Sequence, residues 1–381
     1  MEHPLSLTPT QDAALQSIRS WYKQCHEEKR NAHKLNKPFF YLAGYAGTGK
    51  TTLVGIFRDY ISGKVCYAAY TGKAAMQMRK QGVAAQTVHS LCYIPQVDKE
   101  GKTTFALNPD CELSYAKLLV LDECSMVGKE MGADLLSFET PILVLGDPGQ
   151  LPPIKGTAFF TGKTPDIMLE EVHRQALDSP ILRVATEVRQ GKTLKRTDEE
   201  GLLVYPMLGD GDKEDILLNC EQAITGTNKV RNRGNKIVRE HYDCPGPFPI
   251  TNERLVCLRN NRRFGLFNGL IVQTLSDAKE NGEEIKLNIR TELGTELKSI
   301  RILKECFSNY KAVQELPYNQ RALYDEFDYG YVLTVHKSQG SQWDDVLLLD
   351  DGFLRWDRGQ RKRWLYTAIT RAAEKLTIIR A

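Results

Sequence analysis

One segment restricts the fold of this chain more than any other. Residues 44–51 read GYAGTGKT, a complete G-x-x-x-x-G-K-[ST] pattern, between an apolar run, Phe39–Ala43, and a helical pattern, Leu53–Ile61. A strand, a glycine-rich turn and a helix in this order direct backbone N–H groups and a helix N-terminus at phosphate oxygens. A glycine-rich turn that arose by chance would not be expected between a buried strand and a helix. The segment therefore predicts a phosphate-binding loop that follows a buried strand.

This loop also predicts what the chain binds. Lys50 is placed to hold the β- and γ-phosphates of ATP, and the Thr51 hydroxyl is placed to ligate Mg²⁺. We expect ATP and Mg²⁺ to be the cofactors. The residues expected to contact the nucleotide are Gly44, Ala46, Gly47, Thr48, Gly49, Lys50, Thr51 and Thr52.

A pair of acidic residues completes the predicted site. Asp122 and Glu123 directly follow the apolar run Leu118–Leu121. Because buried acids are costly without a compensating cation, we predict that Asp122 binds Mg²⁺ through water. Glu123 would orient and deprotonate the attacking water, which predicts ATP hydrolysis. The alternative, two acids that only cap a strand end, is disfavoured by the loop upstream.

Short apolar runs recur along the chain and are separated by helical stretches. After the first run they are Val65–Tyr70, Leu118–Leu121, Ile142–Leu145, Ala223–Thr225, Tyr331–Thr334, Val346–Leu349 and Leu376–Ile379. This alternation predicts an α/β fold with parallel sheets covered on both faces. Residues 245–325 differ, because their alternating short strands and glycine-bearing turns predict a β-rich insertion. Residues 94–117 are expected to form a second, shorter insertion.

Composition excludes several classes of protein. The 381 residues carry 51 Lys and Arg against 48 Asp and Glu, and the net charge of +3 excludes a histone-like polycation. Nine cysteines, an odd number without a C-x-x-C pair, argue against a disulfide framework or a zinc ribbon. No signal peptide is visible, and no apolar run reaches the about 18 residues that cross a membrane. We expect a cytoplasmic protein, of a bacterial or phage-infected cell, with reduced thiols and no membrane contact.

Eight further segments, in order along the chain, carry a resemblance to a known family. They are LTPTQ (7–11), YTGKAA (70–75), TVHS (87–90), DECSM (122–126), GDPGQLPP (146–153), VHRQ (172–175), LTVHKSQG (333–340) and LYTAITRA (365–372). Together with the phosphate loop they are similar to the ordered motifs of superfamily 1 helicases, and within these of the RecD-like and Dda-like branch. The match covers nearly the whole chain.

The resemblance implies two RecA-like parallel-sheet motor domains. A small hairpin that splits the duplex is inserted in the first, and a β-rich, SH3-like segment is inserted in the second. The expected boundaries are 1–93 and 118–176 for the first motor domain, 94–117 for its hairpin, 177–244 and 326–381 for the second motor domain, and 245–325 for the SH3-like insertion.

The matched motifs also imply roles for single residues. Gln11 would read the adenine, and Gln150 would sense the γ-phosphate or the attacking water. Arg174 and Arg371 would supply transition-state charge from across a cleft, because a guanidinium offers paired donors to phosphate. The predicted catalytic residues are therefore Lys50, Glu123, Gln150, Arg174 and Arg371.

A further set of side chains is expected to contact DNA. Hydroxyl, imidazole and ammonium groups that follow strands of both sheets suit phosphate contacts that do not read the base sequence. These residues are Thr71, Lys73, Thr87, His89, Ser90, Thr334, His336, Lys337 and Ser338. Phe105 is the candidate wedge that stacks on the first base pair of the duplex. Two alternatives stay open: Phe105 could pack into the base of its own hairpin, and each histidine could be structural.

We therefore expect an ATP-dependent helicase that moves 5′ to 3′ on single-stranded DNA and unwinds fork or 5′-tailed duplex DNA. The direction comes from the resemblance alone. Replication or recombination proteins are the expected partners, and the chain is expected to be a monomer. A RecD-like motor subunit, or an ATPase that remodels nucleoprotein with little unwinding alone, remains the alternative.

Overall fold

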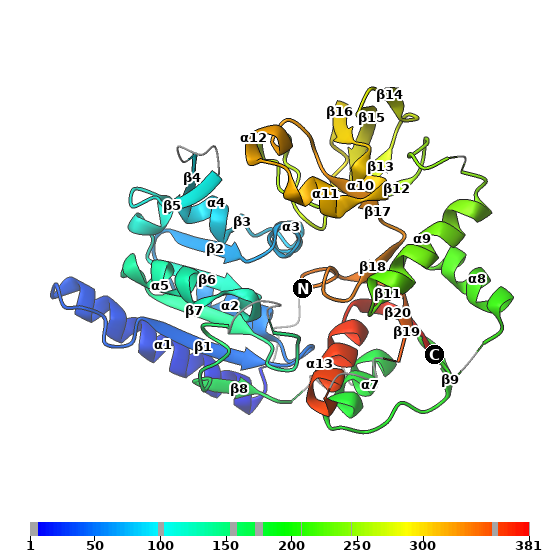
Figure 1. Ribbon diagram of the computed structural model, residues 1–381. Helices are drawn as coiled ribbons and strands as arrows, with labels where there is room; N and C mark the ends of the chain where they lie inside the picture. The colour runs from blue at the N-terminus through cyan, green and yellow to red at the C-terminus, as the bar shows by residue number, and fades with distance from the viewer. Residues whose placement is uncertain are drawn as a thin grey trace.

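The computed structural model describes residues 7–97, 103–152, 158–171, 178–206, 208–244, 246–352 and 357–380. Figure 1 shows three groups of elements. A sheet with its helices from the N-terminal half lies at the left, a second sheet with its helices lies at the lower right, and a β-rich segment lies above the second sheet. The fold is α/β, as the sequence predicts.

The first sheet has six parallel strands. In spatial order they are β3 (Ala85–Thr87), β2 (Val65–Ala69), β6 (Leu118–Asp122), β7 (Ile142–Gly146), β1 (Phe39–Gly44) and β8 (Ile167–Leu169). Because β6, β7 and β1 are parallel neighbours, the segments that follow them emerge at one edge of the sheet. These segments are the phosphate loop, the acidic pair and the GDPGQ motif.

Helices cover this sheet. They are α1 (Pro9–Arg30), α2 (Lys50–Arg58), α3 (Gly72–Lys80), α4 (Val88–Cys92) and α5 (Lys129–Ser137), with 3-10 turns η1 (Glu112–Tyr115) and η2 (Cys124–Met126). Helix α1 opens with a capping box, in which the Thr8 hydroxyl accepts from the Gln11 N–H and the Gln11 side chain accepts from the Thr8 N–H. It ends at Arg30, where Glu28 accepts hydrogen bonds from Asn36 of the segment that follows.

The second sheet also has six strands. In spatial order they are β18 (Val332–Thr334), β11 (Gln222–Thr225), β19 (Trp343–Asp350), β20 (Ala372–Arg380), β10 (Leu202–Tyr205) and β9 (Thr197–Glu199), and only the β9–β10 pair is antiparallel. Its helices are α7 (Pro180–Arg189), α8 (Asp210–Asn219), α9 (Asn228–His241) and α13 (Arg358–Ile369). Helices α7 and α13 lie side by side on the flank that faces the first sheet (Figure 1).

The predicted β-rich insertion is an antiparallel sheet. Its strands are β12 (Arg254–Cys257), β13 (Ile271–Thr274), β14 (Lys279–Asn281), β15 (Glu284–Thr291), β16 (Glu296–Leu303) and β17 (Phe327–Tyr329). Short helices that the sequence did not predict accompany them: η3 (Arg262–Phe264), α10 (Glu305–Ser308), α11 (Tyr310–Glu315) and α12 (Tyr318–Arg321). The SH3-like character of this segment stays a prediction.

The shorter insertion contains a hairpin of two antiparallel strands, β4 (Tyr93–Val97) and β5 (Thr103–Leu107). The chain then returns to the first sheet, where Cys111, Leu113 and Ala116 are buried in its core. Residues 94–117 therefore combine the hairpin with a segment that packs under it.

Every apolar run named above forms a strand of one of the two parallel sheets. In these two sheets the sequence did not predict β3, β8, β9 and β10, which are three or four residues long, a length at which an apolar run alone does not distinguish a strand from other structure. All nine cysteines are free thiols. None of the helices in the described part of the chain has both the length and the apolar character that a membrane span requires.

Candidate nucleotide and nucleic-acid sites

The phosphate loop connects β1 to α2. Gly47 and Gly49 have φ values of 74° and 83°, which residues with a side chain adopt only at a cost. The Lys50 ammonium donates to the carbonyl oxygens of Gly44 and Tyr45 at 2.6 and 2.9 Å. Lys50 thus lies within the loop, where the motif predicts it.

Three carboxyl groups face this loop from the same edge of the sheet. Asp122 and Glu123 follow β6, and Asp147 follows β7. Burial first, and then the charge of Asp122, raise the pKa of Glu123 to about 7, although Arg371 and Lys50 oppose the shift. Burial also raises the pKa of Asp122 and of Asp147. Asp147 is buried and Asp122 and Glu123 are half-buried, and three acids this close together suit a site that receives a metal ion.

The oxygen donors here fit Mg²⁺. This ion takes one or two protein oxygens and keeps several waters. Asp122 and Thr51 are the candidate ligands. Within the described residues no group of three or more His, Cys, Asp or Glu side chains could enclose a metal ion. Asp122 and Thr51 offer one carboxylate and one hydroxyl, so water and phosphate oxygens would supply the rest of the coordination of Mg²⁺.

The second sheet reaches this site through Tyr366 of α13. Its hydroxyl donates to the Asp147 carboxylate at 2.7 Å and accepts from the Ala46 N–H of the phosphate loop at 2.8 Å. Nearby, the Leu151 N–H donates to the Thr367 hydroxyl at 2.9 Å. Hydrogen bonds thus join motifs of the two sheets directly.

Arg371 follows α13 and is buried. Its guanidinium donates to the carbonyl oxygens of Thr367 and Ser341 and to the Thr370 hydroxyl. Burial lowers its pKa, while the carboxylates of Glu123 and Asp147 raise it. Arg371 therefore acts electrostatically on the acids of the first sheet. Arg174, the other predicted arginine, lies outside the described residues.

We call the phosphate loop, the three acids, Tyr366 and Arg371 the nucleotide site. Two predicted glutamines border it. The Gln11 amide donates to the Thr48 carbonyl oxygen at 3.1 Å, so it lies against the loop. The Gln150 side-chain oxygen is buried and has no hydrogen-bond partner among the described residues. Its role as a phosphate sensor stays a prediction, as do the roles of the other predicted site residues.

The residues predicted to contact DNA, which we call the track residues, are less uniform. Lys73 is buried: its ammonium lies 3.2 Å from the Glu292 carboxylate of the β-rich segment and 4.5 Å from the centre of the Trp343 ring. Beside it, a Cβ on Gly72 would lie 2.3 Å from the Phe267 ring. In this conformation, helix α3 is covered by the β-rich segment and the Lys73 charge is already compensated.

The hydroxyl groups of the track residues largely serve the backbone. Thr71 and Thr87 are N-caps of α3 and α4. Ser338 is fully buried and donates to the Val335 carbonyl oxygen, and Thr334 is buried at the end of β18. Ser90 is exposed next to Thr87.

The two sheets bring their track residues together at one point. A Cβ on Gly340, where φ is +75°, would lie 2.6 Å from the Thr71 hydroxyl oxygen. Burial lowers the pKa of His336 and lowers that of Lys337 to about 8. Both residues are half-buried.

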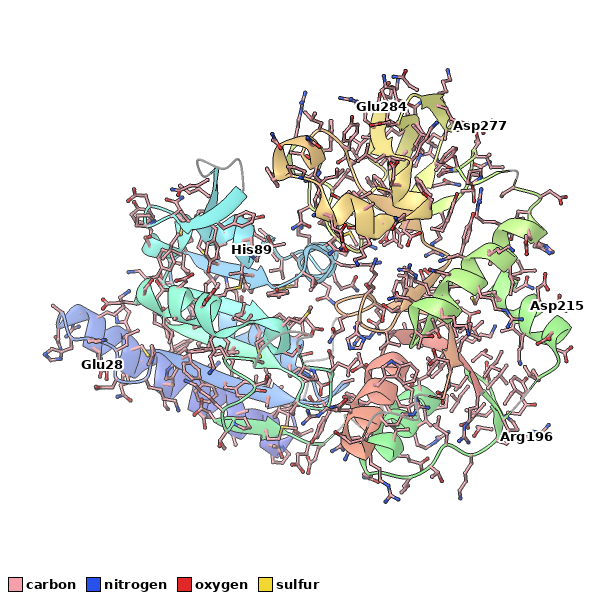
Figure 2. All side chains as sticks on the ribbon, viewed as in Figure 1. Glu28, His89, Arg196, Asp215, Asp277 and Glu284 are labelled. Carbon is pink, nitrogen blue, oxygen red and sulfur yellow. The ribbon has the colours of Figure 1, made fainter. Side chains whose placement is uncertain are left out.

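Phe105 lies on β5 and is 52% exposed. Its ring is edge-on to His89, with 5.4 Å between the centroids, and His89 in turn lies 5.4 Å from the Tyr93 ring. Figure 2 shows His89 at the base of the hairpin. Both alternatives for Phe105 therefore stay open. The exposed part of its ring could stack on a base pair, and the part that contacts His89 could support the hairpin.

Two residues at the nucleotide site were not predicted from the sequence. Tyr366 lies inside the matched motif at 365–372, but the motif by itself assigns it no role. Arg189 ends α7, and its guanidinium lies 3.6 Å from the centre of the Tyr45 ring in the phosphate loop. No local pattern marks Arg189, because its contact depends on how the two sheets meet.

Comparisons with known proteins agree with this arrangement. The model of the AAA domain matches residues 27–203, and the model of the UvrD-like helicase C-terminal domain matches residues 329–379. The ATP-dependent RecD2 DNA helicase of Deinococcus radiodurans is 26% identical over an alignment of 374 residues, which covers 88% of this chain and 46% of that protein. The ATP-dependent DNA helicase dda of Enterobacteria phage T4 is 30% identical over an alignment of 237 residues, which covers 55% of this chain and 54% of that protein. The chain spans about half the length of these curated relatives.

Solved structures show the same fold. Bacteroides Pif1 bound to ssDNA aligns with a TM-score of 0.56 at 17% identity, covering 98% of this chain and 92% of that chain. The Pif1 helicase from Candida albicans aligns with a TM-score of 0.52 at 16% identity, covering 98% and 94%. The likeness extends over both parallel sheets, which confirms the prediction of two RecA-like domains.

Proposed function

This chain belongs to the RecD-like, Dda-like and Pif1-like branch of the superfamily 1 helicases, and from this membership we propose that it is an ATP-driven DNA helicase. ATP and Mg²⁺ are the proposed cofactors. Single-stranded DNA and fork or 5′-tailed duplex DNA are the proposed substrates.

One observation carries this proposal. Arg371 of the second sheet acts on Glu123 and Asp147 of the first, while Tyr366 bonds both Asp147 and the phosphate loop. A nucleotide on the loop would therefore touch groups from both sheets. Binding and release of the γ-phosphate can then change how the sheets are held together, which is what a two-domain motor requires.

The residues divide the chemistry of hydrolysis among them. Lys50 and the loop N–H groups hold the phosphates, and Glu123 takes the proton of the attacking water. Arg371 stabilises the charge that develops on the transferred phosphoryl group. Mg²⁺, bound by Asp122 and Thr51, would neutralise phosphate charge. We further propose the domain boundaries given above and movement from 5′ to 3′, for which the family resemblance is the support.

A fork assay tests this proposal. The purified chain is given ATP and a duplex with either a 5′ or a 3′ single-stranded tail, and strand separation is followed by fluorescence. We expect unwinding of the 5′-tailed substrate only, and none by Lys50→Ala, which should still bind single-stranded DNA. Single-strand-stimulated hydrolysis without unwinding would instead support a motor subunit or a remodelling ATPase.

A further inference from the structure

We propose that Arg189 is a further catalytic residue, which binds the terminal phosphate of the nucleotide held by the phosphate loop. This inference rests on the proposed function, because it assumes that the loop binds ATP. It adds an arginine from α7 to those that the sequence motifs predict.

The position of Arg189 is the first reason. Its guanidinium lies 3.6 Å from the centre of the Tyr45 ring, and Tyr45 is the second residue of the phosphate loop. The Tyr45 and Tyr366 rings also meet edge to face, with centroids 6.3 Å apart. Arg189 thus packs on the loop tyrosine whose ring meets that of Tyr366, the residue whose hydroxyl accepts from the Ala46 N–H.

The unsatisfied donors of Arg189 are the second reason. Its Nε is buried without a hydrogen-bond partner, and no carboxylate pairs with it among the described residues. Arg183, six residues earlier on α7, is instead paired with Glu199 at 2.6 Å. A guanidinium stacked on a ring keeps its N–H donors in the plane, free for an acceptor with several oxygens. A partly buried cation without an anion is costly, so the site favours an anionic ligand.

The space in front of Arg189 is the third reason. A cavity of about 540 Å³ opens between the loop and helices α7 and α13. Three cations, Arg189, Lys362 and Arg363, and one acid, Asp357, line it from the second half of the chain, together with Tyr45 and Gly149 from the first. A phosphate loop holds the β- and γ-phosphates with its N–H groups. The positive side chains of the second half of the chain that line the cavity beside the loop are therefore placed to contact the terminal phosphate.

The test compares ATP with ADP. Arg189→Ala and Arg189→Lys are titrated with fluorescent analogues of both nucleotides, and single-turnover hydrolysis is measured separately. Arg183→Ala is the matched control on the same helix, since its side chain is 49% exposed and pairs outside the site. Thermal melting of each variant reports whether the fold is intact, and Arg189→Gln replaces the alanine variant if that one does not fold.

We expect Arg189→Ala to weaken ATP binding or slow hydrolysis by about 10- to 150-fold, the loss of one charged hydrogen-bonding group. ADP affinity should stay within about twofold, because ADP lacks the phosphate concerned. Arg189→Lys should recover part of the loss. Equal losses for ATP and ADP would show that Arg189 only shapes the loop, and behaviour like Arg183→Ala would remove it from the site.

The two proposals fail in different ways. If the unmodified chain hydrolyses ATP and unwinds DNA but Arg189→Ala does so equally well, the inference is wrong and the proposed function stands. If the unmodified chain does not unwind DNA, yet its preference for ATP over ADP depends on Arg189, the helicase proposal is wrong and the inference stands.

Discussion

The nucleotide site and the track residues differ in the contacts that their side chains already make. At the nucleotide site, groups of both sheets meet directly, and Tyr366 bonds Asp147 and the phosphate loop. Among the track residues, Lys73 meets a carboxylate from the β-rich segment. At the nucleotide site the two sheets bond each other around the phosphate loop, whereas Lys73, a lysine predicted to contact DNA, is already paired with a carboxylate of the protein.

This difference reflects where the partners come from. The phosphate loop and the three acids follow strands of one parallel sheet, so that sheet places them at one edge, and α13 with the turn after it adds Tyr366 and Arg371 from the second sheet. Lys73 sits on α3, and its neighbours Glu292 and Trp343 are more than 200 residues away along the chain. Three substitutions can break or sharpen this comparison.

The largest effect is expected at the nucleotide site. Glu123→Gln removes the proposed base but keeps the size of the side chain. Hydrolysis should fall by roughly 10²-fold or more, the loss typical of general-base catalysis. Nucleotide and Mg²⁺ binding should change little, because Asp122 and Thr51 remain. Stopped-flow phosphate release and nucleotide titration check this, and weaker binding with normal turnover would show that the roles of the two acids are exchanged.

An intermediate effect is expected at the hairpin. Phe105→Ala should leave single-strand-stimulated hydrolysis and translocation near those of the unmodified chain while unwinding falls, most on GC-rich duplexes. Stacking of a base on an aromatic ring contributes about 1–3 kcal/mol, which corresponds to roughly 5- to 150-fold at one step.

The Phe105 test needs a control on the same hairpin. Ile94→Ala on β4 is suitable, because Ile94 is 44% exposed and has no ring. The contact with His89 gives the competing outcome. If Phe105→Ala lowers the melting temperature and reduces hydrolysis and unwinding together, the ring supports the hairpin and is not a wedge.

The sequence predicts the two regions unequally well. It locates eight of the twelve strands of the two parallel sheets and the chemical groups at the phosphate loop, because these depend on local patterns and on the geometry of parallel strands. It does not reveal that Arg189 stacks on Tyr45 or that Glu292 pairs with Lys73. Both contacts join segments remote in the chain, and an isolated Arg or Glu gives no signal of its partner. The short helices α10–α12 escape prediction for a related reason, since four to six residues are too few to show a period.

The smallest effect, and the most direct test of the comparison, is expected from Glu292→Gln. Glutamine keeps the shape of the side chain and can still accept the Ile271 N–H, which lies 2.9 Å from a Glu292 oxygen. It removes the charge that holds Lys73. If Lys73 is a phosphate-binding residue restrained by this carboxylate, affinity for single-stranded DNA should rise by about 2- to 5-fold.

The dependence on salt separates this reading from a general loosening of the fold. Each additional ion pair with a DNA phosphate steepens the plot of log affinity against log salt by about 0.7 on a single strand. Glu292→Gln should show this steeper slope, and adding Lys73→Ala should abolish both the higher affinity and the change in slope.

Glu296→Gln is the matched control, since Glu296 lies on the same sheet and pairs with the exposed Arg290. Equal effects of the two glutamine variants would assign the change to overall charge. Lower affinity in Glu292→Gln alone would show that the Lys73–Glu292 pair supports the DNA-binding conformation. The carboxylate would then hold Lys73 in place for DNA and would not compete with DNA for its charge.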